Sequence, residues 1–439
     1  MALTFGSLDK QYVSTINFLD QREILNSLFD ITNEKDSFLD VMNMMGRKKP
    51  TATVTYHNFV NTELYNVLTV SGTPSGSGTN ASPLLVTVSA GDFAKVREGE
   101  LLLSPNGKVG YIKDATSNVL SVVSVDGEAL SLDDTDKFTV FSNAAGEGSS
   151  APVARRYDVA KYYNQVQIFK DAVKVTDIEE ANKIEFEVNG KPYYFFKLQD
   201  DVLTKFNGDI SFSLLFSRIS ATNFTSGSPT IQDYESGANK VQTTRGLNQY
   251  IEDYGIANSG LDVNTTNYAT LVRNFAQARC PREYIIYAGT EQNIAHDNML
   301  NALTSAASFS PNARINIGGR ELDLGIDKFH LYGYTFYKKH LPILDHRNVL
   351  NFTGSAGYHK RAFFVPNDKV KVVGGGAEDR MSIRYMEQGS GGNTMYQELL
   401  LGALAPQPTS SEQVLEISYK AILGLEVLGA EHFAYWQLS

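Results

Sequence analysis

The clearest periodic pattern in the sequence is an apolar stripe between Pro192 and Ser220. Its members recur at every fourth residue, at Leu198, Val202, Phe206, Ile210 and Leu214. Apolar residues at this spacing fall on one face of an α-helix, and a proline suits the first turn. The pattern predicts a helix of about thirty residues, roughly 45 Å long at about 1.5 Å per residue. We expect the five residues to form the core contact of this spine helix.

Residues 1–50 carry a second, weaker helical pattern, which predicts one or two amphipathic helices. The apolar positions that define it are Leu8, Tyr12, Ile16 and Leu19. So short a segment offers their apolar face no partner, so we predict an arm that packs on the rest of the chain or on a neighbouring copy. The basic run Arg47-Lys48-Lys49-Pro50, which follows, is interpreted as a solvated turn.

From residue 51 to about 150 the pattern changes to short β-runs separated by Gly, Pro, Asn or Asp. The predicted strands are Thr51–Tyr56, Leu64–Val70, Leu84–Val88, Glu100–Leu103, Lys108–Lys113, Asn118–Val125 and Lys137–Phe141. Regular short strands favour a small barrel or sandwich. The low-complexity stretches Ser71–Ser82 and Ser142–Pro152 are interpreted as flexible linkers. The segment therefore resembles a module inserted into a larger fold.

The remainder alternates between helical and extended patterns, which favours a compact α/β unit. An extended stretch covers Tyr162–Phe169, and a helical one is expected to include Val173–Thr176. Further predicted elements are helices at Thr266–Ala278 and Glu291–Ser305, a strand at Glu283–Ala288, and strand-like segments at Ala313–Ile317, Lys328–Lys338 and Ala362–Val373. The pattern of Gln413–Leu428 fits either a strand or a helix.

Composition and charge restrict the class of protein. Of the 439 residues, 42% are hydrophobic and 20% charged, which is typical of a globular chain. A single cysteine, Cys280, excludes a disulfide framework and multi-cysteine zinc sites. The formal net charge of −10 argues against a protein that grips duplex DNA. Neither a secretory signal nor an apolar run of about 18 residues is present, so we predict a soluble, intracellular protein.

Common catalytic signatures are absent, including the phosphate-binding loop and the His-Glu-x-x-His zinc motif. Gly76–Ala81 formally matches a dinucleotide fingerprint, but Ser82-Pro83 and another strand follow it, so a loop is expected. His340, Asp345, His346 and His359-Lys360-Arg361 could bind a metal or relay a proton; polar turns are the favoured interpretation.

Three other features have similarly plain interpretations. Cys280 is expected to be a buried, inert thiol. Glu179, Glu180, Glu185 and Glu187 are interpreted as a solvated acidic face, and Gly374–Gly376 as a turn. We therefore predict no catalytic residue, no cofactor and no metal site.

Several segments together resemble one known family. They are Ala160–Ala181, Pro192–Ser220, Gly246–Ile251, His340–Asn351 and Lys360–Val372. In content and order they are similar to the major capsid proteins of tailed bacteriophages, which have the Hong Kong 97-type fold, and in particular to those of crAss-like phages.

The resemblance implies an α+β fold in which an N-terminal arm leads into an extended loop, followed by a long spine helix and by peripheral and axial domains. The implied parts are the arm (1–50), the extended loop (51–60 and 151–187), a β-rich insertion module (61–150), a peripheral domain with the spine helix (188–245 and 360–439) and an axial α/β domain (246–359). Gln165, Gln167 and Phe169 would lie on the returning strand of the extended loop.

The resemblance also implies self-assembly, as hexamers and pentamers, into an icosahedral shell that encloses the double-stranded DNA genome of a tailed phage. Assembly would occur in the bacterial host cytoplasm, and the mature location would be the virion capsid. Expected partners are copies of the chain itself, portal, scaffold and auxiliary or decoration proteins, and packaged DNA held on the inner face without sequence-specific binding; no membrane is implied. The aromatic content of 11% suits large contacting surfaces.

Two alternatives from other classes remain open at this point. One is a different phage structural protein, such as a tail or sheath subunit. The other is a hydrolase with a β accessory domain and a site around His340–His359. Electron microscopy separates them, because a capsid protein gives closed shells, a sheath protein gives tubes and an enzyme gives a stable monomer.

Overall fold

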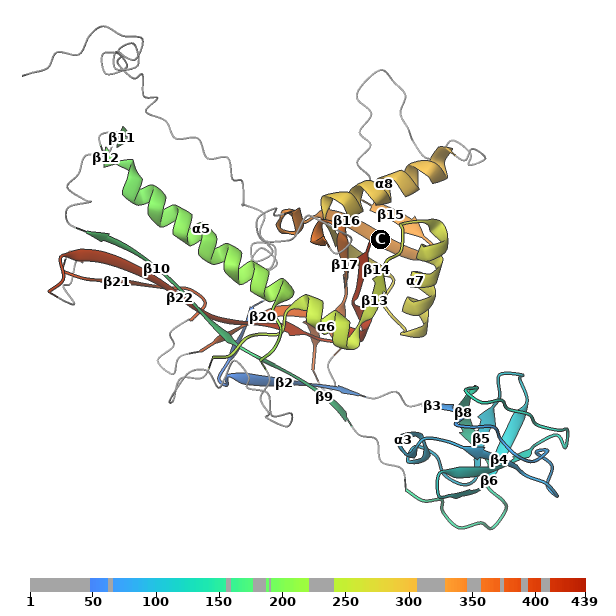
Figure 1. Ribbon diagram of the computed structural model, residues 1–439. Coiled ribbons are helices and arrows are strands. Elements are labelled where there is room, and N and C mark those ends of the chain that lie inside the picture. The colour runs from blue at the N-terminus through green and yellow to red at the C-terminus, as the bar shows by residue number, and fades with distance from the viewer. Residues whose placement is uncertain are drawn as a thin grey trace, which may run out of the picture. The chain divides into compact units, whose positions relative to one another are not determined.

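The computed structural model describes most of the chain beyond its first 47 residues. The described segments are 48–61, 66–154, 159–176, 187–188, 191–220, 241–305, 328–345, 357–371, 375–387, 394–403 and 411–439. The described residues divide into two compact units: Asn58–Tyr162 forms one, and the segments on either side of it form the other (Figure 1).

The unit formed by Asn58–Tyr162 contains a six-stranded antiparallel sheet in the order β3-β8-β5-β6-β7-β4. Its elements are β3 (Asn66–Thr69), β4 (Leu84–Thr87), α3 (Ala90–Phe93), β5 (Glu100–Leu103), β6 (Val109–Thr116), β7 (Val119–Ser124) and β8 (Lys137–Asn143). Alternate strand residues point inward, and thirteen buried apolar side chains, among them Leu102, Ile112 and Phe138, form a separate core. The expected all-β architecture is present.

Ser71–Ser82 belongs to this unit, so its interpretation as a flexible linker was wrong. Ser75 pairs with Leu85 in an antiparallel bridge, and the backbone N–H of Leu130 donates to the carbonyl of Ser77. Gly76 has a φ of +109°, and a Cβ there would lie 2.1 Å from the carbonyl oxygen of Pro83. The glycines permit a tight, hydrogen-bonded turn here, and composition alone does not distinguish such a turn from a mobile linker.

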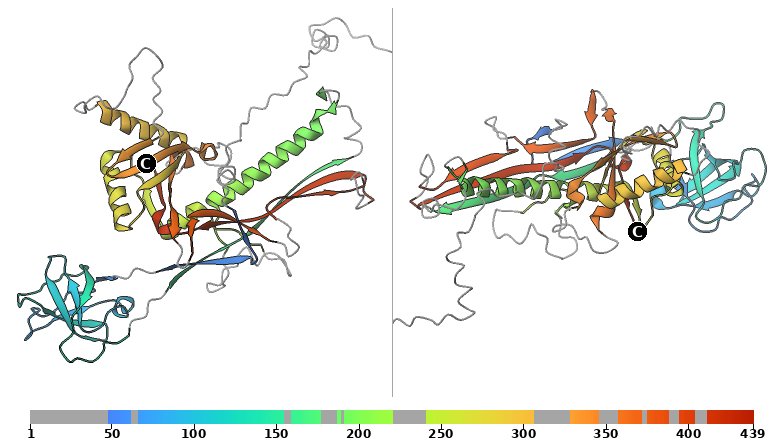
Figure 2. Two further views of the ribbon diagram at one scale, coloured as in Figure 1. Left: turned by 180° about the vertical axis from the view of Figure 1, so that it is seen from behind. Right: turned by 90° about the horizontal axis from the view of Figure 1, so that it is seen from above.

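In the other unit, a long helix packs on an extended sheet (Figures 1 and 2). The helix is α5 (Tyr193–Phe216), and the sheet has the order β1-β20-β22-β10, with β21 also paired to β22. Its strands are β1 (Lys48–Thr51), β10 (Gln167–Thr176), β20 (Met381–Met386), β21 (Gln397–Leu401) and β22 (Val414–Val427). Among the side chains of α5 that the structure describes, those of Phe206, Ile210 and Leu214 are buried and that of Val202 is partly buried. The side chain of Leu198 lies outside the described residues.

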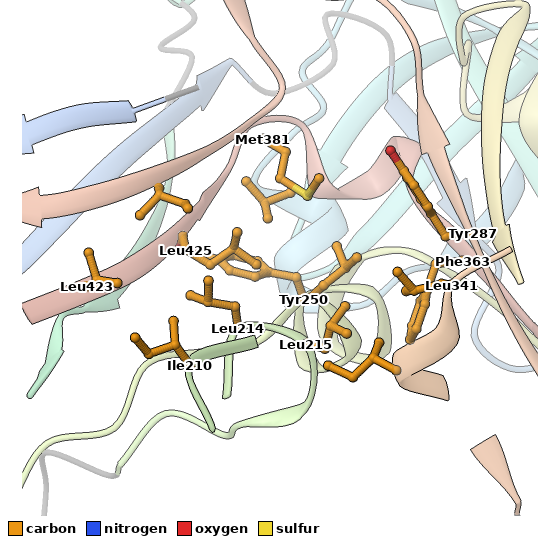
Figure 3. Close-up of a cluster of buried hydrophobic side chains, with 14 of the residues drawn as sticks. Ile210, Leu214, Leu215, Tyr250, Tyr287, Leu341, Phe363, Met381, Leu423 and Leu425 are labelled. Atoms are coloured by element: carbon orange, nitrogen blue, oxygen red, sulfur yellow. The ribbon is translucent and has the colours of Figure 1, made fainter. Parts of the chain in front are cut away.

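The apolar core under α5 is shared with α6 (Leu247–Tyr254). Figure 3 shows Leu214 of α5, Tyr250 of α6 and Leu425 of β22 gathered in one cluster. Pairing with strands that are distant in sequence places β22 in the middle of this core. Burial of each large apolar side chain in the cluster contributes roughly 1.5–3 kcal/mol to stability.

A six-stranded mixed sheet carries the α/β part of the same unit, in the order β13-β23-β17-β14-β16-β15. The strands are β13 (Ile256–Ser259), β14 (Glu283–Ala288), β15 (Lys328–Leu331), β16 (Tyr334–His340), β17 (Arg361–Pro366) and β23 (Ala434–Gln437), accompanied by the helices α7 (Thr265–Gln277) and α8 (Thr290–Ser305). A second aromatic-rich core, which includes Tyr268, Phe275 and Trp436, lies between this sheet and the helices.

The remaining short elements connect these parts. They are β2 (Thr55–Asn61) paired with β9 (Val159–Gln165), β11 (Glu187–Val188) paired with β12 (Lys191–Pro192), β18 (Lys369–Lys371) paired with β19 (Ala377–Asp379), and the 3-10 turns η3 (Pro342–Asp345), η4 (Tyr358–Lys360) and η5 (Ala430–His432). No helix in these described segments is long and apolar enough to cross a membrane.

Several sequence predictions need correction. Val173–Thr176 is strand, not helix, because it pairs residue by residue with Ile417–Val414. Lys328–Lys338 is a hairpin that turns at Tyr332-Gly333, not one strand. β17 and β23 lie in the α/β sheet, although 360–439 was assigned wholly to the peripheral domain. Pairings between residues distant in sequence decide the position of both strands, and a local pattern cannot show them.

Candidate assembly site at the base of the extended ribbon

β2 and β9 form a two-stranded ribbon, and the boundary between the two units falls within it. The predicted loop residues lie where β9 passes into β10. Gln165 is buried, and its side-chain carbonyl accepts from the hydroxyl of Ser220 at 3.2 Å. The side-chain carbonyl of Gln167 accepts from the backbone N–H of Thr244 at 3.2 Å, and Phe169 is buried in the core under α5.

Asn164, the neighbour of Gln165, is completely buried and ties three segments together. Its amide nitrogen donates to the carbonyl of Leu425 at 2.7 Å and to that of Arg245 at 3.1 Å. Its side-chain oxygen accepts from the backbone N–H groups of Arg245 and Gln165, each at 2.7 Å. Both ends of the amide are therefore satisfied, which makes its orientation unique and fixes the end of β9 against β22.

Arg245, whose backbone bonds to Asn164, places its side chain among aromatic rings. Its side chain is 6% exposed, and its guanidinium lies 5.3 Å from the ring centroids of Tyr250 and Tyr254 and 5.8 Å from that of Tyr163. Nη1 also donates to the hydroxyl of Tyr254 at 3.1 Å. Cation–π contacts of this kind are stronger when desolvated, so they help to hold Arg245 in place.

Glu426 is a buried carboxylate on the sheet face opposite α5. It accepts from the hydroxyl of Ser382 at 2.7 Å and from Nη2 of Arg384 at 2.6 Å, and Nζ of Lys49 lies 3.3 Å away. Burial opposes ionisation, but the hydrogen bonds from Arg384 and Ser382 and the nearby positive charges outweigh it and lower the pKa of Glu426. Lys49 lies on strand β1 and also pairs with Glu378 at 2.5 Å, so the prediction of a solvated basic turn was wrong for this residue.

Tyr56 on β2 covers this carboxylate group. Its hydroxyl donates to the carbonyl of Leu425 at 2.6 Å, and the guanidinium of Arg384 lies 5.9 Å from its ring centroid. Gly424 permits the close approach, because a Cβ there would lie 2.9 Å from both the hydroxyl of Tyr56 and the carbonyl oxygen of Gln165.

We call this set of residues the ribbon base. It comprises Lys49, Tyr56, Asn164, Arg245, Ser382, Arg384, Gly424 and Glu426. Its role is structural: hydrogen bonds and ion pairs fix the point at which the ribbon leaves the sheet, although the Nε atoms of Arg245 and Arg384 are buried without a hydrogen-bond partner among the described residues. Sequence reasoning missed it, although one signal was present, since Glu426 interrupts the otherwise apolar run Ala421–Leu428.

The polar cluster considered earlier forms a helix cap. The carboxylate of Asp345 accepts from the hydroxyl of Thr290 at 2.6 Å and from its backbone N–H at 3.0 Å, at the first residue of α8. His340 Nε2 lies 2.6 Å from the same carboxylate, and His359 is buried. Within the described segments, no three His, Cys, Asp or Glu side chains are grouped so that they could hold a metal ion. His346 lies outside those segments.

Other predicted features are placed as follows. Cys280 is buried, and burial raises the pKa of its thiol. Gly76–Ala81 is a turn followed by β4, so no helix begins directly after it, as a dinucleotide site would require. Outside the described residues lie the arm positions Leu8, Tyr12, Ile16 and Leu19, the segment Ala313–Ile317, and Gly374.

A model of the SU10 major capsid protein family matches residues 7–324, more than two-thirds of the chain. The chain belongs to the SU10 major capsid protein family. The prediction of a shell-forming capsid protein of a bacteriophage is confirmed, and this capsid protein is structural rather than enzymatic. Its elements follow the Hong Kong 97-type order that the sequence predicted, an extended ribbon, a long helix and an α/β sheet. The likeness to crAss-like phages in particular stays a prediction.

The capsid protein is also similar to solved structures of low sequence identity. A structure of Microbacterium phage Oxtober96 has 10% identity and a TM-score of 0.42, over 97% of this chain and 98% of that chain. The SrpI encapsulin of Synechococcus elongatus PCC 7942 has 9% identity and a TM-score of 0.39, over 100% and 96%. The capsid of a native GTA particle has 7% identity and a TM-score of 0.41, over 99% and 100%. No curated protein matches the sequence.

Proposed function

We propose that this capsid protein assembles, as hexamers and pentamers, into an icosahedral shell around the double-stranded DNA genome of a tailed phage, within the cytoplasm of a bacterial host. The observation that carries the proposal is the family match over residues 7–324. Portal, scaffold and auxiliary proteins would complete the particle. The net charge of −10 supports a lumen that does not bind packaged DNA tightly or by sequence.

The ribbon is proposed as an element of contact between copies. Its origin is fixed by the ribbon base, and the large aromatic side chain of Phe59 on β2 is 67% exposed. Burying such a ring against another copy would contribute up to about 3 kcal/mol. The apolar arm residues Leu8, Tyr12, Ile16 and Leu19 are proposed to make a second contact between copies.

Residues 61–150 are proposed to be a module that folds independently, inserted on the extended loop and used for shell stability, decoration or host contact. Its separate apolar core, which includes Leu68, Val86 and Leu120, supports independent folding. A fragment of residues 51–155 should therefore show a β-type circular dichroism spectrum and a cooperative melt. A disordered fragment would contradict the proposal.

Expression of the full chain followed by negative-stain microscopy tests the proposed function. Closed polyhedral particles with vertices, resolved by image averaging into hexamers and pentamers, are the expected result. Tubes would indicate a sheath-like protein, and a stable monomer under all assembly conditions would contradict a self-assembling shell.

A further inference from the structure

The sheet formed by β10, β22 and β21 has one covered face. α5 lies on it: Asp171 of β10 pairs with Lys205 of α5, and the ring of Tyr419 on β22 lies 6.1 Å from that of Phe206. Because successive strand residues point to opposite faces, the neighbours Lys170 and Lys420 point away from α5.

Lys170 and Lys420 are directly opposite each other in the antiparallel pair. Like charges in this arrangement are destabilising. No carboxylate in the described segments pairs with either ammonium, whereas Lys174, further along β10, pairs with Glu412 at 3.1 Å. Glu416, an acidic residue on the same face of β22, is the register partner of Lys174 and not of Lys170. The two opposed lysines therefore lack a compensating charge within these parts of the subunit.

Apolar side chains flank the lysines on the same face. Ile168, two residues before Lys170, is 55% exposed, and Leu399 on β21 is 56% exposed. Leu399 points away from α5, because its neighbour Glu398 faces the helix and accepts from Gln199 at 3.4 Å. We call Ile168, Lys170, Leu399 and Lys420 the lysine face. A cationic centre with apolar flanks is complementary to an acidic segment that also carries apolar side chains.

Residues 1–46 have this chemistry. They contain seven carboxylates and three basic side chains, a net charge of −4, together with the stripe Leu8, Tyr12, Ile16 and Leu19. Asp9 and Asp20 lie directly beside the two ends of that stripe. Duplex DNA would satisfy the lysines but not the exposed Ile168 and Leu399, so the observations favour a protein segment over phosphate.

We propose that the lysine face binds the N-terminal segment, residues 1–46, of a neighbouring copy. The inference rests on the proposed function, because it requires copies that meet in a shell. It assigns a defined receptor to the arm: acidic side chains such as Asp9 and Asp20 neutralise Lys170 and Lys420, and the apolar stripe covers Ile168 and Leu399.

Charge reversal of the full chain tests this. The variant Lys170→Glu/Lys420→Glu should fold with a near-normal melting temperature but give at least about tenfold fewer closed particles, because like charges at a contact are strongly unfavourable. Adding Asp9→Lys/Asp20→Lys should restore the particles. The matched control Lys137→Glu/Lys371→Glu changes the net charge equally on exposed strand lysines elsewhere and should assemble normally.

Cross-linking provides a second readout, which does not require the charge-reversal variants to fold. Tagged Lys420→Cys and untagged Asp9→Cys chains are co-assembled and oxidised with copper phenanthroline; Cys280 is buried and should not compete. A disulfide between the two chains supports the proposal. The absence of this cross-link from closed shells overturns it. A second variant that carries both substitutions in one chain gives the complementary test, and a disulfide found only within single chains of that variant also overturns the proposal.

The remaining outcomes separate the two levels of inference. Normal particle numbers for the reversed variant, or no rescue by the arm substitutions, overturn the docking proposal alone. Normal shells that hold less DNA also overturn it, in favour of phosphate binding. If the unaltered chain forms no shell, the proposed function fails and the docking proposal fails with it.

Discussion

The contact between α5 and its sheet is mainly apolar, whereas the ribbon base, further along β22, combines buried polar groups with partly exposed charged side chains. Under α5, Phe206, Ile210 and Leu214 meet aliphatic and aromatic side chains and need no particular hydrogen-bond geometry. At the ribbon base, Asn164 and Glu426 are buried only because each of their oxygens has a donor. Apolar burial supplies most of the stability, and the directed hydrogen bonds of Asn164 and Glu426 specify one arrangement.

The largest loss of stability is expected at the apolar contact. Phe206→Ala removes a buried ring and leaves a cavity, so it should lower the free energy of unfolding by about 3–5 kcal/mol. Denaturant titration of the soluble subunit measures this. Lys205→Ala, one residue away on the exposed side of α5, removes only surface ion pairs and should change stability by less than about 1 kcal/mol. Equal effects would mean that the helix presents a different face to the sheet.

A somewhat smaller effect is expected at the buried carboxylate. Glu426→Gln removes the charge that compensates Arg384 and Lys49, and should cost about 2–3 kcal/mol. Glu378→Gln is the matched control, since Glu378 contacts the same Lys49 but is 46% exposed, and should cost at most about 1 kcal/mol. Equal melting temperatures for the two variants would show that the buried ion pair of Glu426 stabilises the fold no more than the exposed pair of Glu378.

Steric crowding at the ribbon base should have a further, smaller effect. Gly424→Ala forces the new methyl group toward the hydroxyl of Tyr56 and the carbonyl of Gln165, and should cost about 1–2 kcal/mol. Gly146→Ala, where no atom lies within 4 Å of the added Cβ, should be nearly silent by thermal melting. A silent Gly424→Ala would show that β2 does not pack against β22 this closely.

The two regions should also differ in their response to acid. The pKa of Glu426 is lowered on folding, so its ionised form stabilises the fold above the ordinary carboxyl pKa of about 4.5. This contribution should be lost as the pH falls through the lower folded-state pKa. The stability difference between the native chain and Glu426→Gln should therefore shrink below about pH 4.5, whereas the effect of Phe206→Ala should not change with pH. A constant difference for Glu426→Gln would contradict the assigned charge state.

The same contrast explains what the sequence could predict. The helix around Phe206 and the strand Glu283–Ala288 follow from local sequence patterns. The helix, expected at Pro192–Ser220, spans Tyr193–Phe216, and the strand has the expected bounds. The ribbon base depends on pairs such as Asn164 with Leu425, which are 261 positions apart, and on Lys49 meeting Glu426. No local pattern encodes such contacts, so the capsid class could be predicted but the residues that fix the ribbon could not.

The central claim is that the subunit folds alone and that segments outside its core build the shell. Deleting residues 2–30 tests this most directly, with the full chain as the control and both negative-stain microscopy and thermal melting as readouts. The account predicts a soluble subunit with a near-normal melting temperature and no closed particles, because the apolar stripe from Leu8 to Leu19 is lost. Shells of normal size from the truncated chain would contradict the assembly role of the arm, and an unfolded subunit would show instead that the arm belongs to the core.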